Sequence, residues 1–391
     1  MPVNKLPFDQ PELLRPAPLL RGLQAEGPVH RVHTQTGDDA WLVTGYEEVR
    51  RLLDDDRLGR SHPQPEKAAR IGESALFGGP MGDFDTERED HTRMRSLLQP
   101  HFTPKRMRAF RPRVEELTTQ LLDELERQGS PADLHQALAL PLPILVICEL
   151  LGVPYEDRGQ FRAWSEAAGN TADHARSMQG LTDLYEYGKR MVELKRHEPG
   201  DDVITRLLEL PDTDEDEIAM RAMNLLFAGH ETTVVQIGMG ALFLLANSGQ
   251  WEALLAEPDL LTGAIEEIMR TPMVNGTGGI PRYARVDLAV GDAMVKAGEL
   301  VLLHIGMANH DEKVFADPER FDVTRQAAGH VSFGYGARYC IGAPLARIEL
   351  QAVFAQLIPR FPGMRLAVPV EELRLRADSL TSGLVSLPVK W

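Results

Sequence analysis

The chain of 391 residues is acidic, with a formal net charge of −16 at neutral pH, and 43% of its residues are hydrophobic. That charge argues against a nucleic-acid partner, because binding phosphates needs a basic surface. No apolar run approaches the roughly 20 residues that span a bilayer, so no membrane segment is expected. The N-terminal stretch MPVNKLPFDQPELLRP lacks a signal-peptide pattern, and two cysteines cannot form a disulfide framework. We therefore expect a cytoplasmic protein with a sizeable core.

The predicted elements begin with a small strand-rich part that leads into a long helical part. Two short strands, VHRVHTQ and AWLVT, come first, and the helix YEEVRRLLDD follows them. Helical periodicity dominates from about residue 89 to residue 261, and the longest helix is expected over residues 214–248. Apolar residues cover almost all of this helix, which predicts that it is buried in the middle of the fold.

Strand patterns return after residue 271 in YARVDLAV and ELVLLHI, and a last helix is expected over residues 343–357. The C-terminal stretch LRLRADSLTSGLVSLPVKW predicts a strand, a turn and a strand. Neither a linker nor a repeat divides the sequence, so we expect residues 1–391 to form a single domain. The predicted fold class is α+β, mainly helical with a smaller strand-rich part.

The stretch FGYGARYCIG, residues 333–342, places Cys340 in a glycine-rich turn that leads into the last helix. Unpaired N–H groups at a helix start stabilise a thiolate, which can serve as a nucleophile or as a metal ligand. A nucleophile needs a base, and no nearby histidine is an obvious one, so a thiol-dependent hydrolase remains only as an alternative. Cys148, in the apolar run LPILVICELL, is best explained as a small buried hydrophobe. One thiolate without other protein ligands fits haem, whose porphyrin fills the in-plane positions of the iron.

The same stretch resembles the haem-binding signature of the cytochromes P450, Phe-Gly-x-Gly-x-His/Arg-x-Cys-x-Gly, at every fixed position. Other marks of the family follow in the right order. They are HTRMR at residues 91–95, AGHETT at 228–233, AIEEIMR with its Glu-x-x-Arg pair, and PERF at 318–321. The resemblance covers essentially the whole chain. It implies the P450 fold, a triangular helical prism whose long central helix crosses the haem, and it implies monooxygenase activity.

The resemblance also implies roles for individual residues. Cys340 would bind the iron of haem b (iron protoporphyrin IX), and Glu267 with Arg270 would form a structural pair under the cysteine loop. Glu231 and Thr232 would be the catalytic acid and alcohol that deliver protons for O2 activation, which favours a true monooxygenase. The residues expected to contact the haem or its propionates are His91, Arg95, Ala228, Gly229, Arg282, Phe333 and Arg338.

The substrate is less constrained, because family resemblance fixes the chemistry and not the substrate. The residues expected to contact it are Leu225, Val274, Asn275, Gly276, Leu380 and Thr381. The chain resembles actinobacterial P450s that tailor secondary metabolites, above all those that oxidise polyene macrolides. This implies a macrolide or similar metabolite, with regioselective hydroxylation of a polyene macrolide antibiotic precursor as the first choice. The alternatives are epoxidation of a polyene macrolide, oxidation of a terpenoid lactone, and a haem-thiolate sensor or binding protein without catalysis.

The segment from Arg88 to Arg113 is strongly basic although the whole chain is acidic. A solvated helix face is the plain explanation, and an anionic cofactor or an acidic protein partner is the functional one. By resemblance, electrons would come from an acidic ferredoxin and an NAD(P)H-dependent reductase, and a monomer is expected. The outward residues expected to dock the ferredoxin are Arg93, Lys105, Arg106 and Arg108.

Overall fold

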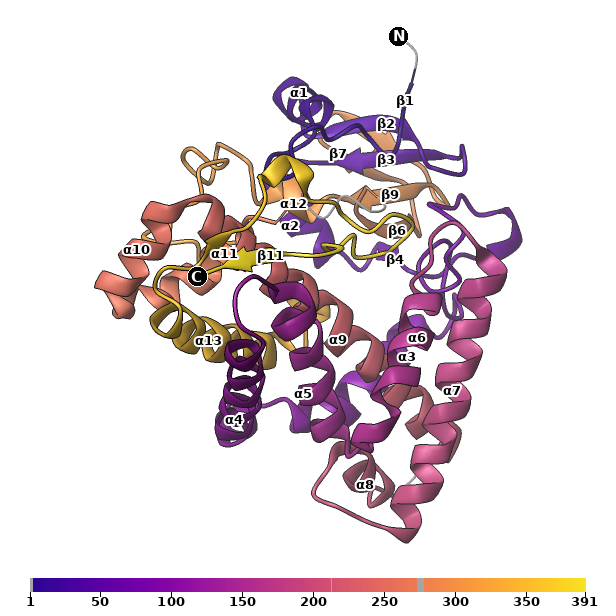
Figure 1. Cartoon of the computed structure of the whole chain (residues 1–391). Helices are drawn as coiled ribbons and strands as arrows, with labels where there is room; N and C mark the ends of the chain where they lie inside the picture. Colours follow the sequence, from indigo (N-terminus) through magenta and orange to yellow (C-terminus); the bar gives the residue numbers. More distant parts are fainter. Residues whose placement is uncertain (1–2, 212, 273–277) are drawn as a thin grey trace.

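The structure is a computed structural model that describes residues 3–211, 213–272 and 278–391. A strand-rich part lies at one end of the molecule and helices make up the rest, which confirms the predicted mainly helical α+β class (Figure 1). The helices are α1 (Pro18–Glu26), α2 (Tyr46–Leu53), α3 (Glu87–Leu98), α4 (Pro104–Gln128), α5 (Pro141–Leu151), α6 (Arg158–Ala168), α7 (His174–His197), α8 (Val203–Leu208), α9 (Glu215–Ala246), α10 (Ser248–Ala256), α11 (Leu261–Arg270), α12 (Ile305–Ala308) and α13 (Ala343–Arg360).

The largest sheet has six strands in the order β1-β2-β3-β9-β6-β4. Its strands are β1 (Asn4–Lys5), β2 (Val29–His33), β3 (Asp39–Val43), β9 (Leu300–Leu303), β6 (Ile280–Ala284) and β4 (Leu58–Gly59). The pairs β1–β2 and β3–β9 are parallel, and the other pairs of this sheet are antiparallel. Two smaller sheets join β10 (Arg365–Leu366), β11 (Pro388–Lys390) and β5 (Ala132–Asp133), and join β7 (Leu288–Val290) and β8 (Ala293–Val295).

Two strand predictions were wrong in detail. YARVDLAV was expected as one strand, but β6 ends at Ala284 and β7 begins at Leu288 in a different sheet. The C-terminal stretch was expected to form a strand, a turn and a strand, but before β11 it contributes only isolated bridges, one between Leu375 and Leu384 and one between Ser379 and Asn170. Asp378 and Ser382 adopt positive φ angles of 52° and 43°, which interrupt an extended chain.

Helix α9 is the long helix that the sequence predicted, and it runs through the middle of the helical part (Figure 1). The Asp214 side chain caps its start by accepting from the backbone N–H of Asp216 across 2.9 Å, and the acidic first turn suits the helix dipole. Helices α5, α7, α11 and α13 pack around it, so most of its side chains are buried. In the described ranges no single helix is long and apolar enough to cross a membrane; α9 and α10 pass that test only as a pair, which bends by 97°.

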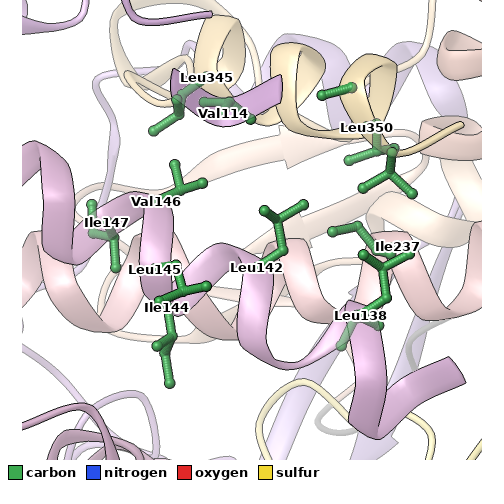
Figure 2. Packing of buried hydrophobic residues seen from close by; sticks show 14 of the residues in the cluster. Val114, Leu138, Leu142, Ile144, Leu145, Val146, Ile147, Ile237, Leu345 and Leu350 are labelled. Carbon is green, nitrogen blue, oxygen red and sulfur yellow. The ribbon is translucent and has the colours of Figure 1, made fainter. Parts of the chain in front are cut away.

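The main hydrophobic core joins α4, α5, α9 and α13 (Figure 2). Side chains from all four helices meet there with at most 1% of their surface exposed, namely Val114, Leu142, Val146, Ile237 and Leu350. Burying each aliphatic side chain of this kind contributes roughly 1.5–3 kcal/mol. Because α13 follows directly after the cysteine loop, this core fixes the position of that loop against α9.

Candidate active site

Cys340 lies in a tight loop between a short 3-10 turn (Gly336–Arg338) and α13. The loop folds back because the backbone N–H of Cys340 donates to the Phe333 carbonyl across 2.7 Å. Gly334 and Gly336 have φ angles of 74° and 65°, which glycine adopts without strain. A Cβ atom on Gly336 would also collide with the Asp54 side chain. The loop therefore needs Gly334 and Gly336, because only glycine permits this backbone conformation.

The Cys340 sulfur accepts hydrogen bonds from the backbone N–H groups of Gly342 and Ala343. These are the donors that the sequence predicted, and α13 begins at Ala343, where the last helix was expected to start. The residue is exposed because it opens into a cavity, whereas the surrounding protein shields the thiol from bulk water. Burial raises the pKa of the Cys340 thiol, and the two backbone donors with Arg95 oppose that rise.

A cavity of about 200 Å³ separates the cysteine loop from α9. Ala228 and Thr232, one helical turn apart, are exposed in the mostly buried middle of this helix because they face the cavity. The cavity thus brings together four of the eight residues that were expected to contact the haem, along with the predicted catalytic Thr232 and the predicted substrate contact Leu225. The predicted residues that line the cavity are Leu225, Ala228, Gly229, Thr232, Phe333 and Cys340.

Two details of α9 concern the predicted oxygen site. The Thr232 hydroxyl donates to the Ala228 carbonyl across 3.0 Å, so this hydroxyl is held beside the helix and toward the cavity. A Cβ atom on Gly229 would lie 2.8 Å from Cδ1 of Ile147 in α5. Glycine at this position therefore allows close packing of α5 on α9, a reason that the sequence did not indicate.

Glu231 points away from that cavity and is 4% exposed. Its Oε2 accepts from Nη2 of Arg376 across 2.6 Å and from the Thr381 hydroxyl across 3.0 Å. Burial alone would raise the pKa of Glu231, but His230 and Arg376 lower it below its ordinary value. Burial lowers the pKa of His230 itself to about 4, so His230 is uncharged at neutral pH. Arg376 is therefore the partner that holds Glu231 as a carboxylate.

Glu231 lines a second, polar cavity of about 470 Å³ between α6, α9 and the C-terminal stretch. Leu380 and Thr381, both expected to contact substrate, lie in its wall. Glu231 and Thr232 are adjacent in the chain but open onto different cavities on two sides of α9. Three more predicted contacts, Val274, Asn275 and Gly276, lie outside the described residues.

The predicted propionate ligands gather near the start of α3. Burial lowers the pKa of Arg282 in β6 to about 9, and repulsion from Arg60 and Arg338 adds to this effect. Burial also lowers the pKa of His91, with Arg338 and Arg95 acting in the same direction. Arg95 donates from Nη1 to the Tyr339 carbonyl across 2.9 Å, next to Cys340.

Two further residues of this group, one cation and one carboxylate, were not predicted from the sequence. Arg60 lies just after β4, and Glu87 is the first residue of α3. Glu87 accepts from Nη2 of Arg338 across 2.6 Å. Neither residue belongs to a motif, and only the fold places them beside Arg282 and Arg338.

Glu267 and Arg270 form the buried pair that was expected, with both side chains 0% exposed. Nε of Arg270 donates to Oε2 of Glu267 across 2.7 Å, and Nη2 donates to Oε1 across 2.9 Å. Oε1 of Glu267 also accepts from Nε of Arg325 across 3.2 Å, and Arg270 reaches the Asn309 carbonyl. The pair thus ties α11 to the chain segments that precede the cysteine loop.

Comparison with known proteins supports the family assignment. Residues 188–365 match the family described as Cytochrome P450. Pentalenolactone synthase of Streptomyces exfoliatus is 45% identical over 398 residues, which cover 99% of each chain. The chain belongs to the cytochrome P450 family. The family and fold inferred from FGYGARYCIG and its companion motifs are therefore confirmed.

Two further relatives of this P450 come from macrolide biosynthesis. Mycinamicin IV hydroxylase/epoxidase of Micromonospora griseorubida is 38% identical over 376 residues, covering 94% of each chain. The substrate-free structure of a polyene macrolide antibiotic pimaricin epoxidase superposes with a TM-score of 0.89 at 39% identity, covering 100% of this chain and 99% of that one. The protein is accordingly a P450 monooxygenase that uses a haem iron, a small-molecule substrate and redox partners.

Proposed function

We propose that this P450 hydroxylates a polyene macrolide antibiotic precursor at one position, using haem b bound through Cys340. The observation that carries the proposal is the cavity whose opposite walls are the Cys340 loop and the Ala228–Thr232 face of α9. A haem that lies between them would have the thiolate on one side and the hydroxyl of Thr232 on the other. When bound, a thiolate-ligated haem supplies the oxygen chemistry.

The residues around Cys340 fit such a cofactor. The N–H groups of Gly342 and Ala343 stabilise negative charge on the sulfur, as an iron ligand requires. The arginines Arg60, Arg282 and Arg338 are crowded together, and anionic propionates would relieve their mutual repulsion. We propose haem b, the type that is not covalently attached to the protein. The second cysteine, Cys148, is buried in α5 and is not expected to form a covalent bond to haem.

Glu231 and Thr232 support an oxygen-activating enzyme rather than a haem-binding sensor. Glu231 faces the polar cavity as a carboxylate, and Thr232 holds a hydroxyl at the cavity of Cys340. A proton taken up at Glu231 on one side of α9 can therefore be passed to the Thr232 side, the role of a general acid and its relay. Binding alone would not need such an arrangement.

The second cavity favours a substrate with many polar groups. The haem would occupy the cavity at Cys340, whereas the second cavity carries Glu231, Arg376, Thr381 and other polar groups. A polyene macrolide carries a row of hydroxyl groups, which suits this polar lining. Likeness to pentalenolactone synthase supports the terpenoid lactone as the second candidate, and likeness to the pimaricin epoxidase supports epoxidation.

Substrate titration tests the proposal. A polyene macrolide precursor is expected to shift the spin state of the ferric protein at low micromolar concentration, and turnover should give one hydroxylated product by mass spectrometry. Thr381→Val should weaken this binding about tenfold, because it removes a polar group from the second cavity. Ser382→Ala is the matched control, because its hydroxyl bonds the Ser379 carbonyl instead. A spin shift with a terpenoid lactone and none with the macrolide would contradict the choice of substrate.

For the redox partner we propose an acidic ferredoxin, reduced by an NAD(P)H-dependent reductase, and we propose that the P450 acts as a monomer. Lys105 and Arg108 are exposed in the first turns of α4, in the last third of the basic segment. Two other expected docking residues are engaged within the chain: Arg93 bonds Glu217, and Arg106 bonds His101. Reversing the charges of Lys105 and Arg108 should slow electron transfer from the ferredoxin, with a weaker effect at high salt.

A further inference from the structure

Glu87 is a buried carboxylate at the first position of α3, 8% exposed, to which no motif assigns a role. Both of its oxygens accept from the backbone N–H of Arg60, at 2.9 and 3.0 Å. Oε2 also accepts from the backbone N–H of Ser61 at 3.1 Å and from the Ser61 hydroxyl at 2.5 Å. These contacts fix the carboxylate against the chain that follows β4.

The same carboxylate reaches two arginines from distant parts of the sequence. Nη2 of Arg338 donates to Oε1 of Glu87 across 2.6 Å, and Nη2 of Arg285 donates to Oε2 across 3.2 Å. Arg338 lies two residues before Cys340, and Arg285 follows directly after β6. Glu87 therefore connects α3, the chain after β4, the end of β6 and the cysteine loop at one point.

The charges around Glu87 are not balanced. Arg60, Arg282 and Arg338 act on one another as like charges, and Glu87 is the acid that acts on Arg60 and Arg282. Arg282 is 7% exposed, and in the described chain its guanidinium bonds only the carbonyl of Pro281, at 2.8 Å. Buried cations need a counter-charge, and one carboxylate cannot neutralise Arg60, Arg282 and Arg338 together with Arg285, whose side chain is 26% exposed. The two negative charges of the haem propionates would offset much of this excess.

We propose that Glu87 is a positioning residue for the cofactor, which holds Arg338 and the Arg60–Ser61 backbone ready to receive the two haem propionates. The inference rests on the proposed haem site and goes beyond it, because Glu87 itself would not touch the haem. It acts by keeping one arginine at the propionate position and by limiting the repulsion among the others before the haem arrives.

Two consequences distinguish this role from a general contribution to folding. When Glu87 lacks its carboxylate, Arg338 loses a charge-assisted hydrogen bond and can turn away from the propionate position. The haem should then dissociate faster. The charge of Glu87 also favours ferric over ferrous haem, because the ferric form carries one more positive charge. Removing the charge should therefore make the reduction potential more positive, and by more than removing the same charge from the exposed Glu89 in the same helical turn.

The test uses the purified haem-containing protein with Glu87→Gln and, as a matched control, Glu89→Gln. Glu89 is exposed in the same helical turn, so both variants lose one negative charge from the start of α3. Transfer of haem to apomyoglobin, followed by the Soret band, should be about tenfold faster in Glu87→Gln and unchanged in Glu89→Gln. The reduction potential should become more positive in Glu87→Gln than in Glu89→Gln. Equal transfer rates and equal potentials in the two variants would overturn the inference.

Two more variants keep the test decisive. Arg338→Gln combined with Glu87→Gln should release haem no faster than Arg338→Gln alone, because the two residues act as a unit, and additive effects would contradict this. If Glu87→Gln does not fold, Ser61→Ala is used in its place, because it removes only one donor to the Glu87 carboxylate. The rate of haem transfer should then rise by a smaller factor, and an unchanged rate would overturn the inference. A wild-type protein that retains no haem would instead contradict the proposed haem site.

Discussion

Arg376 donates from Nη2 to Oε2 of Glu231 across 2.6 Å, although the two residues are 145 positions apart in the chain. The pair lies between the polar cavity and α9 and determines the charge of the proposed proton donor. Arg376→Gln removes the charge and the hydrogen bond by which Arg376 lowers the pKa of Glu231, so this pKa should rise.

The protonated carboxyl band of Glu231 in the infrared spectrum, identified by its loss in Glu231→Gln, measures this change over a pH series. Arg374→Gln is the control, because Arg374 belongs to the same stretch but bonds the carbonyls of Glu371 and Leu373. Titration of Glu231 at the same pH in both arginine variants would show that Arg376 does not hold its charge.

Thr232→Ala should separate oxygen consumption from product formation. The variant loses the hydroxyl that faces the cavity of Cys340, while the fold and the substrate-binding surface remain. We expect product formed per O2 consumed to fall about tenfold or more, with hydrogen peroxide produced instead and the substrate dissociation constant unchanged. Thr232→Ser keeps the hydroxyl and should restore coupling. Equal coupling in the alanine and serine variants would rule out a proton-relay role for this residue.

Glu267→Gln should destabilise the protein strongly, because it leaves the guanidinium of Arg270 buried without a counter-charge. Breaking a fully buried ion pair costs about 3–5 kcal/mol of the free energy of unfolding, measured by urea denaturation. Glu124→Gln breaks a pair with Arg127 whose side chains are 45% and 70% exposed, and it should cost less than about 1 kcal/mol. Similar losses in the two variants would contradict a structural role for Glu267.

The lowered pKa of Glu266 predicts how the free energy of unfolding changes in acid. Burial alone would raise the pKa of Glu266, but Arg347, bonded at 2.7 and 2.8 Å, and His330 lower it to about 2. The folded-state pKa lies below the ordinary value of 4.5, so the stabilisation is complete above pH 4.5 and is lost as the pH falls toward 2. This stabilisation amounts to roughly 3 kcal/mol.

Urea unfolding between pH 6 and pH 3 measures this loss of stability. The loss should be smaller in Glu266→Gln than in the wild-type protein, and the same as wild type in the exposed control Glu252→Gln. The same slope in both variants would contradict the assignment.

The parts of the fold that follow from local patterns could be predicted from the sequence. Helix α9 has an acidic start and an apolar length, and the glycines before Cys340 allow its loop to fold back. The face shared by Ala228 and Thr232 follows directly from helical spacing. These features depend on residues that are close together in the chain, so their spacing carries the information.

The partners that set the charges of the site could not be predicted. Glu87 meets Arg338 over 251 positions, and Arg376 meets Glu231 over 145. Single residues without a motif give no signal for such pairs. The division of the site into two cavities could not be predicted either, because the adjacent residues Glu231 and Thr232 line different cavities on two faces of one helix.

The most direct test of the central claim is the visible spectrum of the reduced protein with carbon monoxide, recorded beside its Cys340→Ala variant. A thiolate-ligated haem gives a strongly red-shifted Soret band, and we predict this band for the wild-type protein and its loss in the variant. An unshifted band in the wild-type protein, or a shifted band that survives in Cys340→Ala, would contradict the assignment of Cys340 as the iron ligand.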